Sequence, residues 1–206
     1  MKIKNLAAVI LAGGKNSRLN YEKSLLQIEN HYFIQHQVEI LKEFFDEIII
    51  VTEKESLTNM FQQVRFAKDN FSNCGPIGGI EAAMDKYHFE NYFVFACDMP
   101  FLNKAIIRRM IISHNKNNCA ITIPQHKEGI EPLHAIYNRK VLEILQQNIR
   151  LGYYQVRNVF QNVDVNYQYF NENEIKFFFN INTPKDLEIF SKMANLNEIS
   201  AISKTK

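Results

Sequence analysis

Leu6-Ala-Ala-Val-Ile-Leu-Ala-Gly-Gly14 is a run of seven apolar residues that ends in two glycines. Every position from Leu6 to Ala12 is apolar, so the run has no polar face to turn toward water. Such a run is typical of a strand buried on both faces, as in a parallel sheet. The paired glycines let the backbone take positive φ and approach a ligand closely. The stretch therefore predicts a central strand followed by a functional loop.

Outward from this strand, short apolar runs alternate with longer segments of helical periodicity. Further runs follow at Glu47–Thr52, Gln63–Ala67 (the weakest), Tyr92–Cys97 and Cys119–Pro124. Between them, apolar residues recur every three or four positions, as in Ile34, Val38, Leu41 and Phe45, and in Ile106, Ile107, Met110 and Ile111. This alternation predicts right-handed βαβ units, hence an α/β fold of three layers with a mostly parallel sheet. We expect one domain over residues 1–194, a frayed tail at 195–206, and ligands at the carboxyl ends of the strands.

The pattern changes after Pro124. Gln125–Glu131 is a polar turn, and Pro132–Tyr137 has the composition of a strand returning from it. Helical segments near 140–148 and 153–160 follow, then an edge strand at Val163–Tyr167. A last helix is expected to begin with Thr183 as N-cap and Pro184 in its first turn.

Composition narrows the functional classes. Of 206 residues, 24 are Lys or Arg and 22 are Asp or Glu, so a net charge of +2 gives no general argument for nucleic acid or an acidic membrane. No apolar stretch approaches the roughly 18–20 residues of a membrane span. Three cysteines without a CxxC motif argue against a disulfide scaffold. We therefore expect a soluble cytoplasmic protein.

The loop after the first strand combines glycines with positive charge. Lys15, Arg18 and Lys23 lie within nine positions of one another, and successive N–H groups in a Gly-rich loop form an anion-binding concavity. A polyphosphate would suit such a loop at the carboxyl end of a parallel strand; an ordinary βα turn with solvated lysines is the alternative. Neither the Walker pattern nor the dinucleotide fingerprint is present, because the required further glycines are missing.

Two acidic residues follow other strands of the predicted sheet. Asp98 ends the strand Tyr92–Cys97 and is well placed to hold Mg²⁺ against phosphates, since Mg²⁺ prefers one or two carboxylates plus substrate oxygens. Its alternative role is a cap for the helix near Asn103. Asp69 follows the weak third strand and precedes Cys74-Gly-Pro-Ile-Gly-Gly79, where Gly78 and Gly79 let something press against a helix. Asp69 could instead cap locally, and the glycines could serve close packing alone.

In their order and spacing, these loops together resemble the molybdenum cofactor guanylyltransferases. The resemblance rests on Leu11-Ala-Gly-Gly-x-x-Ser-Arg18 with Lys23, on Asp69 with Gly75-Pro-Ile-Gly-Gly79, on Cys97-Asp-Met-Pro-Phe101, and on Glu131-Pro-Leu-His-Ala-Ile-Tyr137 and Asn180-Ile-Asn-Thr-Pro-Lys-Asp-Leu187. It covers about residues 6–190. The sequence departs from the family pattern at Asn20 and Glu22, where Gly and Asp are usual.

The resemblance implies a Rossmann-like fold of the nucleotide-diphospho-sugar-transferase type. It also implies transfer of GMP from GTP to the terminal phosphate of Mo-molybdopterin, with release of pyrophosphate and Mg²⁺ as cofactor. Molybdoenzyme-specific chaperones or apo-enzymes are the further partners it suggests. By motif position, the nucleotide would be bound by Leu11, Ala12, Gly13, Gly14, Lys23, Asp69 and Asp98.

The remaining implied roles concern catalysis and the acceptor. Asp98, Lys23 and Arg18 would be catalytic, with Asp98 holding the metal, and His134, Asn180 and Asn182 would contact the acceptor. The residues themselves agree with nucleotidyl transfer, which needs positioning and charge neutralisation rather than covalent help from the protein. A carboxylate such as Asp69 could accept hydrogen bonds from the N–H edge of guanine, which adenine cannot offer.

Two other functions remain open at this stage. One is a cytidylyl- or sugar-phosphate nucleotidyltransferase of the same fold, although Leu11-Ala-Gly-Gly favours guanine over the Leu-Ala-Ala-Gly of the cytidylyl relatives. The other is a non-catalytic protein that binds and carries the cofactor. Such a carrier would keep the glycine loop but would not need the metal carboxylate.

Overall fold

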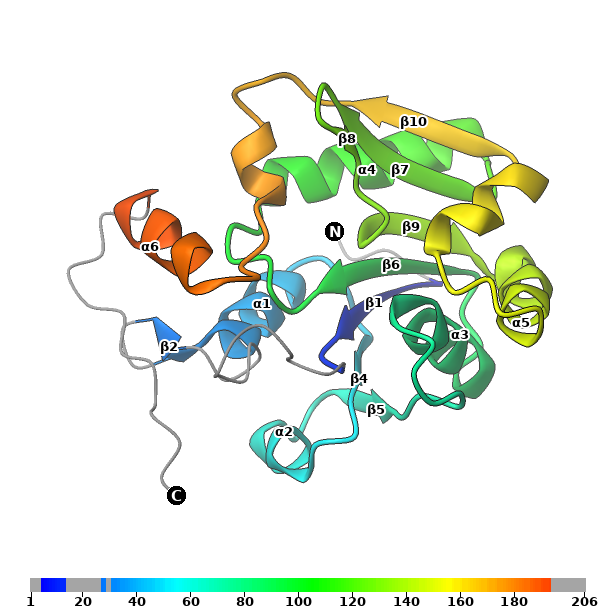
Figure 1. Cartoon of the computed structure of the whole chain (residues 1–206), viewed down its shortest axis with the longest axis horizontal. Coiled ribbons are helices and arrows are strands. Elements are labelled where there is room, and N and C mark those ends of the chain that lie inside the picture. Colours follow the sequence, from blue (N-terminus) through cyan, green and yellow to red (C-terminus); the bar gives the residue numbers. More distant parts are fainter. Residues whose placement is uncertain (1–4, 14–26, 29–30, 194–206) are drawn as a thin grey trace.

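An eight-stranded mixed sheet forms the centre of the described part of this computed structural model, which comprises residues 5–13, 27–28 and 31–193 (Figure 1). The strand order is β10-β7-β9-β6-β1-β4-β5, with β8 paired to β7. The strands are β1 Leu6–Leu11, β4 Ile48–Val51, β5 Arg65–Ala67, β6 Asn91–Ala96, β7 Ile121–His126, β8 Gly129–Ile130, β9 His134–Asn138 and β10 Val165–Tyr169. A separate short ribbon pairs β2 Gln27–Ile28 with β3 His31–Tyr32.

The direction of the strands divides the sheet in two. β1 runs parallel to both β4 and β6, β4 runs parallel to β5, and β7 runs parallel to β10. β9 runs antiparallel to β6 and to β7, and β8 antiparallel to β7. The predicted mostly parallel α/β sheet is therefore confirmed. The exceptions are β8 and β9, which follow the polar turn and return from it.

The alternation of side chains along β1 shows why its residues are all apolar. Ala8 and Ile10 lie in one hydrophobic cluster, and Ala7 and Val9 lie in a second cluster on the opposite face. Because both faces of the strand are covered, a polar residue at any of these positions would lie in a core. Leu6-to-Leu11 is buried throughout, as the sequence predicted.

Helices cover both faces and complete the three layers. The first cluster contains residues of α1 Phe33–Leu41 and α4 Lys104–Asn117; the second contains residues of α3 Pro76–Lys86 and α5 Leu142–Arg150. The other helical segments are α2 Glu55–Met60, α6 Pro184–Met193 and the 3-10 segments η2 Arg139–Val141, η3 Val156–Asn162 and η4 Ile175–Phe178. The expected helix near 153–160 is thus a 3-10 helix, and α1 ends at Leu41, before Phe45.

Two helix starts follow the local rules of capping. Thr183 precedes α6, where its Oγ1 accepts from the Asp186 N–H (3.2 Å) and its own N–H donates to Asp186 Oδ2 (2.7 Å). Asn103 caps α4 by accepting from two backbone N–H groups of the first turn.

The predicted domain limit at residue 194 and the tail 195–206 lie outside the described residues. No helix among the described residues is long and apolar enough to cross a membrane.

Candidate active site

The carboxyl ends of β1 and β6 bring the two central predicted positions together. Leu11 pairs with Ala96 in the parallel register, and the Cys97 N–H donates to the Leu11 carbonyl (3.2 Å). Gly13 and Asp98 each follow this pair by two residues, so both lie at the same edge of the sheet. Gly13 is exposed and Asp98 is half-buried. The edge thus presents an exposed glycine backbone beside a carboxylate-bearing loop.

β4 continues this edge on the other side of β1. The Ala12 N–H donates to the Val51 carbonyl (3.0 Å), which fixes the turn just before Gly13. Gly14, Arg18 and Lys23, which we predict to bind and neutralise the phosphates, lie outside the described residues. Their roles stay predictions.

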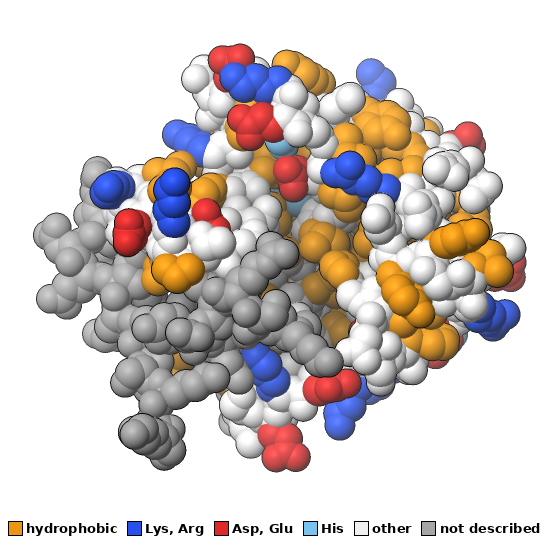
Figure 2. Space-filling model, viewed as in Figure 1, with side chains coloured by type: hydrophobic (Ala, Val, Ile, Leu, Met, Phe, Trp, Pro, Cys, Tyr) orange, Lys and Arg blue, Asp and Glu red, His pale blue; other side chains and the backbone are white. Residues whose placement is uncertain are grey.

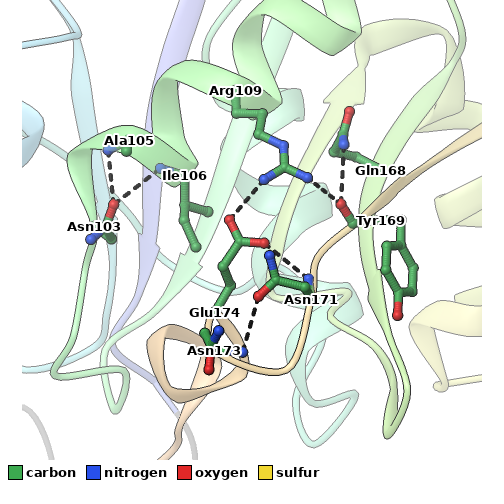
Figure 3. A network of polar contacts seen from close by, with 9 residues as sticks. All are labelled: Asn103, Ala105, Ile106, Arg109, Gln168, Tyr169, Asn171, Asn173 and Glu174. Atoms are coloured by element: carbon green, nitrogen blue, oxygen red, sulfur yellow. Dashed lines mark hydrogen bonds and ion pairs between the residues drawn. The ribbon is translucent and has the colours of Figure 1, made fainter.

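Asp98 is held by its backbone rather than used as a helix cap. Its carbonyl accepts from the Ile181 N–H at 2.9 Å, which ties the 180–182 segment to the end of β6. Asn103 Oδ1 takes the N-cap role for α4, accepting from Ala105 (2.9 Å) and Ile106 (3.2 Å), as Figure 3 shows. The alternative assignment of Asp98 as the cap is therefore wrong.

One carboxylate at a sheet edge fits Mg²⁺ better than it fits a metal with an all-protein cage. Within the described part of the chain, no three His, Cys, Asp or Glu side chains gather closely enough to hold a metal ion. Mg²⁺ is commonly held by one or two carboxylates together with substrate phosphates and waters. Asp98, at the same edge as the glycine loop that we predict to bind phosphates, would supply one such carboxylate.

Asp69 lies against the first turn of α3. Its Oδ1 accepts from the Phe71 N–H at 3.1 Å, so the local cap expected as an alternative is present. A Cβ on Gly78 would lie 2.4 Å from Asp69 Oδ1, which explains the absence of a side chain there. Burial raises the pKa of Asp69, while the hydrogen bond from Phe71 opposes this shift. The group that presses against the helix at Gly78 is thus the Asp69 carboxylate.

The residue after Asp69 fastens the same loop to α3 a second time. Asn70 Nδ2 donates to Glu81 Oε2 (3.0 Å), and Gln146 of α5 donates to Glu81 Oε1 (2.8 Å). Glu81 is only 1% exposed, and each of its two buried carboxylate oxygens accepts a hydrogen bond from one of these amides. The Asp69 carboxylate is consequently carried by a loop with two fixed points on one helix.

His134, predicted to contact the acceptor, lies in the core. It is 1% exposed, and its ring is surrounded edge-on by Phe93, Phe95 and Phe178 at centroid distances of 5.1 to 5.4 Å. Neither ring nitrogen has a hydrogen-bond partner among the described residues, and burial lowers the pKa of the imidazole to about 3. This burial does not fit the predicted contact of His134 with the acceptor.

Asn180 and Asn182 flank the residue that touches Asp98. Asn180 is half-buried, and its Nδ2 donates to the Phe178 carbonyl (3.0 Å). Asn182 is exposed, and its backbone N–H donates to Asp186 Oδ2 (2.9 Å). Ile181 between them donates to the Asp98 backbone carbonyl, so both asparagines belong to the segment that is bonded to the end of β6.

An ion pair between Arg109 and Glu174 joins α4 to η4, which precedes the 180–182 segment. Arg109 of α4 bonds to Glu174 Oε1 (2.7 Å), and Glu174 Oε2 accepts from the Asn171 N–H (2.9 Å) (Figure 3). The pair thereby fastens η4 to α4, and η4 carries Phe178.

Figure 2 shows that the face seen in Figure 1 is hollowed near its centre, with hydrophobic side chains inside the hollow.

A histidine–carboxylate pair in the polar turn is a feature that sequence reasoning missed. His126 Nε2 and Glu131 Oε1 lie 2.9 Å apart. In the β7–β8 hairpin His126 opposes Gly129, so Glu131 is its diagonal neighbour. Burial raises the pKa of Glu131, and the hydrogen bond from His126 opposes that shift. Hairpin register around Gly129 is the signal that could have revealed the pair.

Comparison with known proteins places these features in a family context. Residues 8–166 match the model of the MobA-like NTP transferase domain. The chain is 30% identical over 201 residues to a "Probable molybdenum cofactor guanylyltransferase" of Carboxydothermus hydrogenoformans, covering 95% of this chain and 100% of the relative. It is 33% identical to one of the same description from Clostridium perfringens, covering 88% of this chain and 94% of that protein.

Among solved structures, the fold is similar to that of the "Molybdopterin-guanine dinucleotide biosynthesis protein A" of Archaeoglobus fulgidus. The TM-score is 0.79 at 26% identity, over 92% of this chain and 98% of that one. The likeness therefore extends over almost the whole of both chains.

Proposed function

The chain belongs to the MobA-like NTP transferase domain family, and from that premise we propose that it transfers GMP from GTP to the terminal phosphate of molybdopterin. The observation that carries the proposal is the pairing of β1 with β6, because Gly13 and Asp98 follow the carboxyl ends of these two neighbouring strands. A triphosphate needs both kinds of group at once: backbone N–H donors for its oxygens and a carboxylate for its metal ion. The names of the relatives supply the guanine donor and the molybdopterin acceptor.

In the proposed reaction an oxygen of the acceptor phosphate attacks the α-phosphorus of GTP. The new P–O bond forms as the bond between the α-phosphorus and the bridging oxygen breaks, and pyrophosphate leaves with that oxygen. The acceptor phosphate is already anionic at neutral pH, so no side chain has to remove a proton from it. The protein must instead bring together two groups that repel each other.

The residues divide this task by position. The Gly13 backbone and the cations Arg18 and Lys23 would bind the phosphates of GTP and offset the charge on departing pyrophosphate. Asp98 would hold Mg²⁺, which when bound neutralises charge on the phosphate oxygens. Asp69 would accept hydrogen bonds from the guanine N–H groups. Each charge-assisted contact of this kind contributes roughly 1.5–3 kcal/mol.

The sequence has three cysteines and no CxxC motif, a pattern that is typical of proteins in a reducing compartment such as the cytoplasm. Delivery of the product to molybdoenzyme-specific chaperones or apo-enzymes belongs to the same proposal.

Incubation with α-labelled GTP, Mg²⁺ and molybdopterin tests the activity directly. We expect a labelled GMP adduct of the acceptor and one equivalent of pyrophosphate. The matched control replaces GTP by CTP, and a protein active only with CTP would instead be a cytidylyltransferase. A wild-type protein that binds nucleotide but transfers it to none of the plausible acceptors would be a carrier.

A further inference from the structure

The turn that leads into β9 lies at the same edge of the sheet as Asp98, on the side away from Asp69. β9 runs antiparallel to β6, and the Ala96 N–H at the end of β6 donates to the Leu133 carbonyl (3.1 Å). Glu131 begins this turn, because its carbonyl accepts from the His134 N–H (3.1 Å). In the strand order β9-β6-β1-β4-β5, Asp98 therefore lies between the loop of Glu131 and the loop of Asp69.

The carboxylate of Glu131 is held in a fixed orientation. His126 Nδ1 accepts from the Glu128 backbone N–H (3.2 Å), so the proton of the neutral ring is on Nε2, and Nε2 donates to Glu131 Oε1 (2.9 Å). The His126 ring is stacked on Phe178, with centroids 5.5 Å apart and planes at 24°. Only 4% of the His126 side chain is exposed, against 22% of Glu131. A buried imidazole thus orients a carboxylate that still reaches the surface.

The two ends of the proposed product have the same hydrogen-bonding edge. Guanine and a pterin each carry an amino group next to a ring N–H, and one carboxylate can accept from both of these donors. From β5 to β9 there are four strand spacings, about 19 Å at roughly 4.8 Å each. Loops carried by strands this far apart, with Asp98 on a strand between them, suit a dinucleotide whose two ring systems lie on either side of its pyrophosphate.

We propose that Glu131 binds the amino and ring N–H groups of the acceptor's pterin, and that His126 is the positioning residue for Glu131. The inference rests on the proposed function, because that function supplies a pterin acceptor. It assigns the acceptor to the β9–β7 side of Asp98 and the guanine to the β5 side. Asn180 and Asn182 flank Ile181, whose N–H donates to the Asp98 carbonyl.

Two probes that differ at one group test the assignment. 6-Hydroxymethylpterin has the amino group, and 6-hydroxymethyllumazine has a carbonyl oxygen in its place. In a fluorescence titration, we expect the full-length protein to bind the pterin at least about tenfold more tightly than the lumazine, the loss of one charge-assisted hydrogen bond. Equal affinity for the two probes, or no affinity for the pterin, overturns the proposal.

Variants then show which residues cause the preference for pterin over lumazine. Glu131→Gln should remove most of the preference for pterin and leave the affinity for GTP unchanged, whereas Asp69→Asn should do the reverse. His126→Phe keeps a ring to stack on Phe178 but loses the donor to Glu131, so it should reduce the preference in part. A purely structural role for His126 would leave the ratio of the two affinities unchanged. Glu143→Gln, the same change at an exposed glutamate of α5, should behave as the wild type.

The same samples separate this inference from the proposed function. GMP transfer and GTP binding in the wild type with no effect of Glu131→Gln on the pterin preference would refute the role of Glu131 alone. A wild type that selects pterin over lumazine but transfers no GMP would refute the proposed reaction and leave the pterin site standing.

Discussion

Gly78→Ala should weaken the binding of guanine by Asp69 while leaving the free energy of unfolding nearly unchanged. Gly78 lies in the first turn of α3 with ordinary backbone torsions, so alanine meets no backbone strain. Alanine is favoured over glycine in a helix by up to about 1 kcal/mol. The new methyl group, however, would lie 2.4 Å from Oδ1 and 2.9 Å from Oδ2 of Asp69.

The size of the effect follows from this contact. The Asp69 carboxylate would have to move by about 0.6 Å to restore even a 3.0 Å separation, the closest that real Cβ contacts reach. Movements of about 1 Å in a positioned group can cost on the order of a hundredfold in rate. If the moved carboxylate loses one charge-assisted bond to guanine, the affinity for GTP should fall by roughly tenfold to a hundredfold. The affinity for CTP, which has no guanine edge, should change much less.

Calorimetry with GTP and CTP in the presence of Mg²⁺ measures this, alongside urea unfolding. We expect the free energy of unfolding to stay within about 1–2 kcal/mol of the wild type, because the helix gain offsets part of the crowding. Gly79→Ala is the matched control, since its methyl group would meet the movable end of Leu11 at 3.0 Å instead of a carboxylate. A folded Gly78→Ala protein that binds GTP within twofold of the wild type would refute the role of Asp69 in base recognition.

Three further changes test other parts of the structure. Asp98→Asn should lower turnover in steady-state kinetics by at least about a hundredfold, while calorimetry still shows GTP binding; an unaffected rate would contradict the role of Asp98. Burial lowers the pKa of His134 from 6.5 to about 3, so only the unfolded chain binds this proton between those pH values. Its contribution to stability is complete above pH 6.5 and falls by about 3 kcal/mol by pH 4.5. His134→Leu should remove this part of the pH dependence. Urea unfolding at pH 7 and 4.5 measures it, and an equal loss of unfolding free energy in the variant and the wild type would contradict the assignment to His134. Glu81→Gln should cost about 1–2 kcal/mol, because one amide partner then faces another donor, and unchanged urea unfolding would argue against the buried contacts.

The central strands could be predicted because burial on both faces demands an unbroken apolar run. Leu6–Ala12 and Tyr92–Cys97 are such runs, and both are found as adjacent strands with their predicted loops at one edge. The start of α6 was equally predictable, because Thr183 and Asp186 cap it through contacts only three residues apart. Local chemistry was sufficient in these cases.

What the sequence did not reveal depends on partners far along the chain. A single strand pattern at 132–137 does not show that Phe93, Phe95 and Phe178 close around His134, since those rings come from β6 and η4. The glycines of α3 indicated a close approach, but not that Asp69 is the group that makes it. The His126–Glu131 pair likewise requires the register of a hairpin that spacing alone does not fix.

The central claim is that the ends of β1 and β6 converge on one triphosphate. Its most direct test is a crystal structure with a non-hydrolysable GTP analogue and Mn²⁺ in place of Mg²⁺, in which anomalous scattering locates the metal. We expect the Mn²⁺ peak within coordination distance of the Asp98 carboxylate and of the phosphates, with the phosphates over Gly13 and the guanine on the side of Asp69. A metal peak away from Asp98, or a nucleotide bound at another edge of the sheet, would contradict the claim.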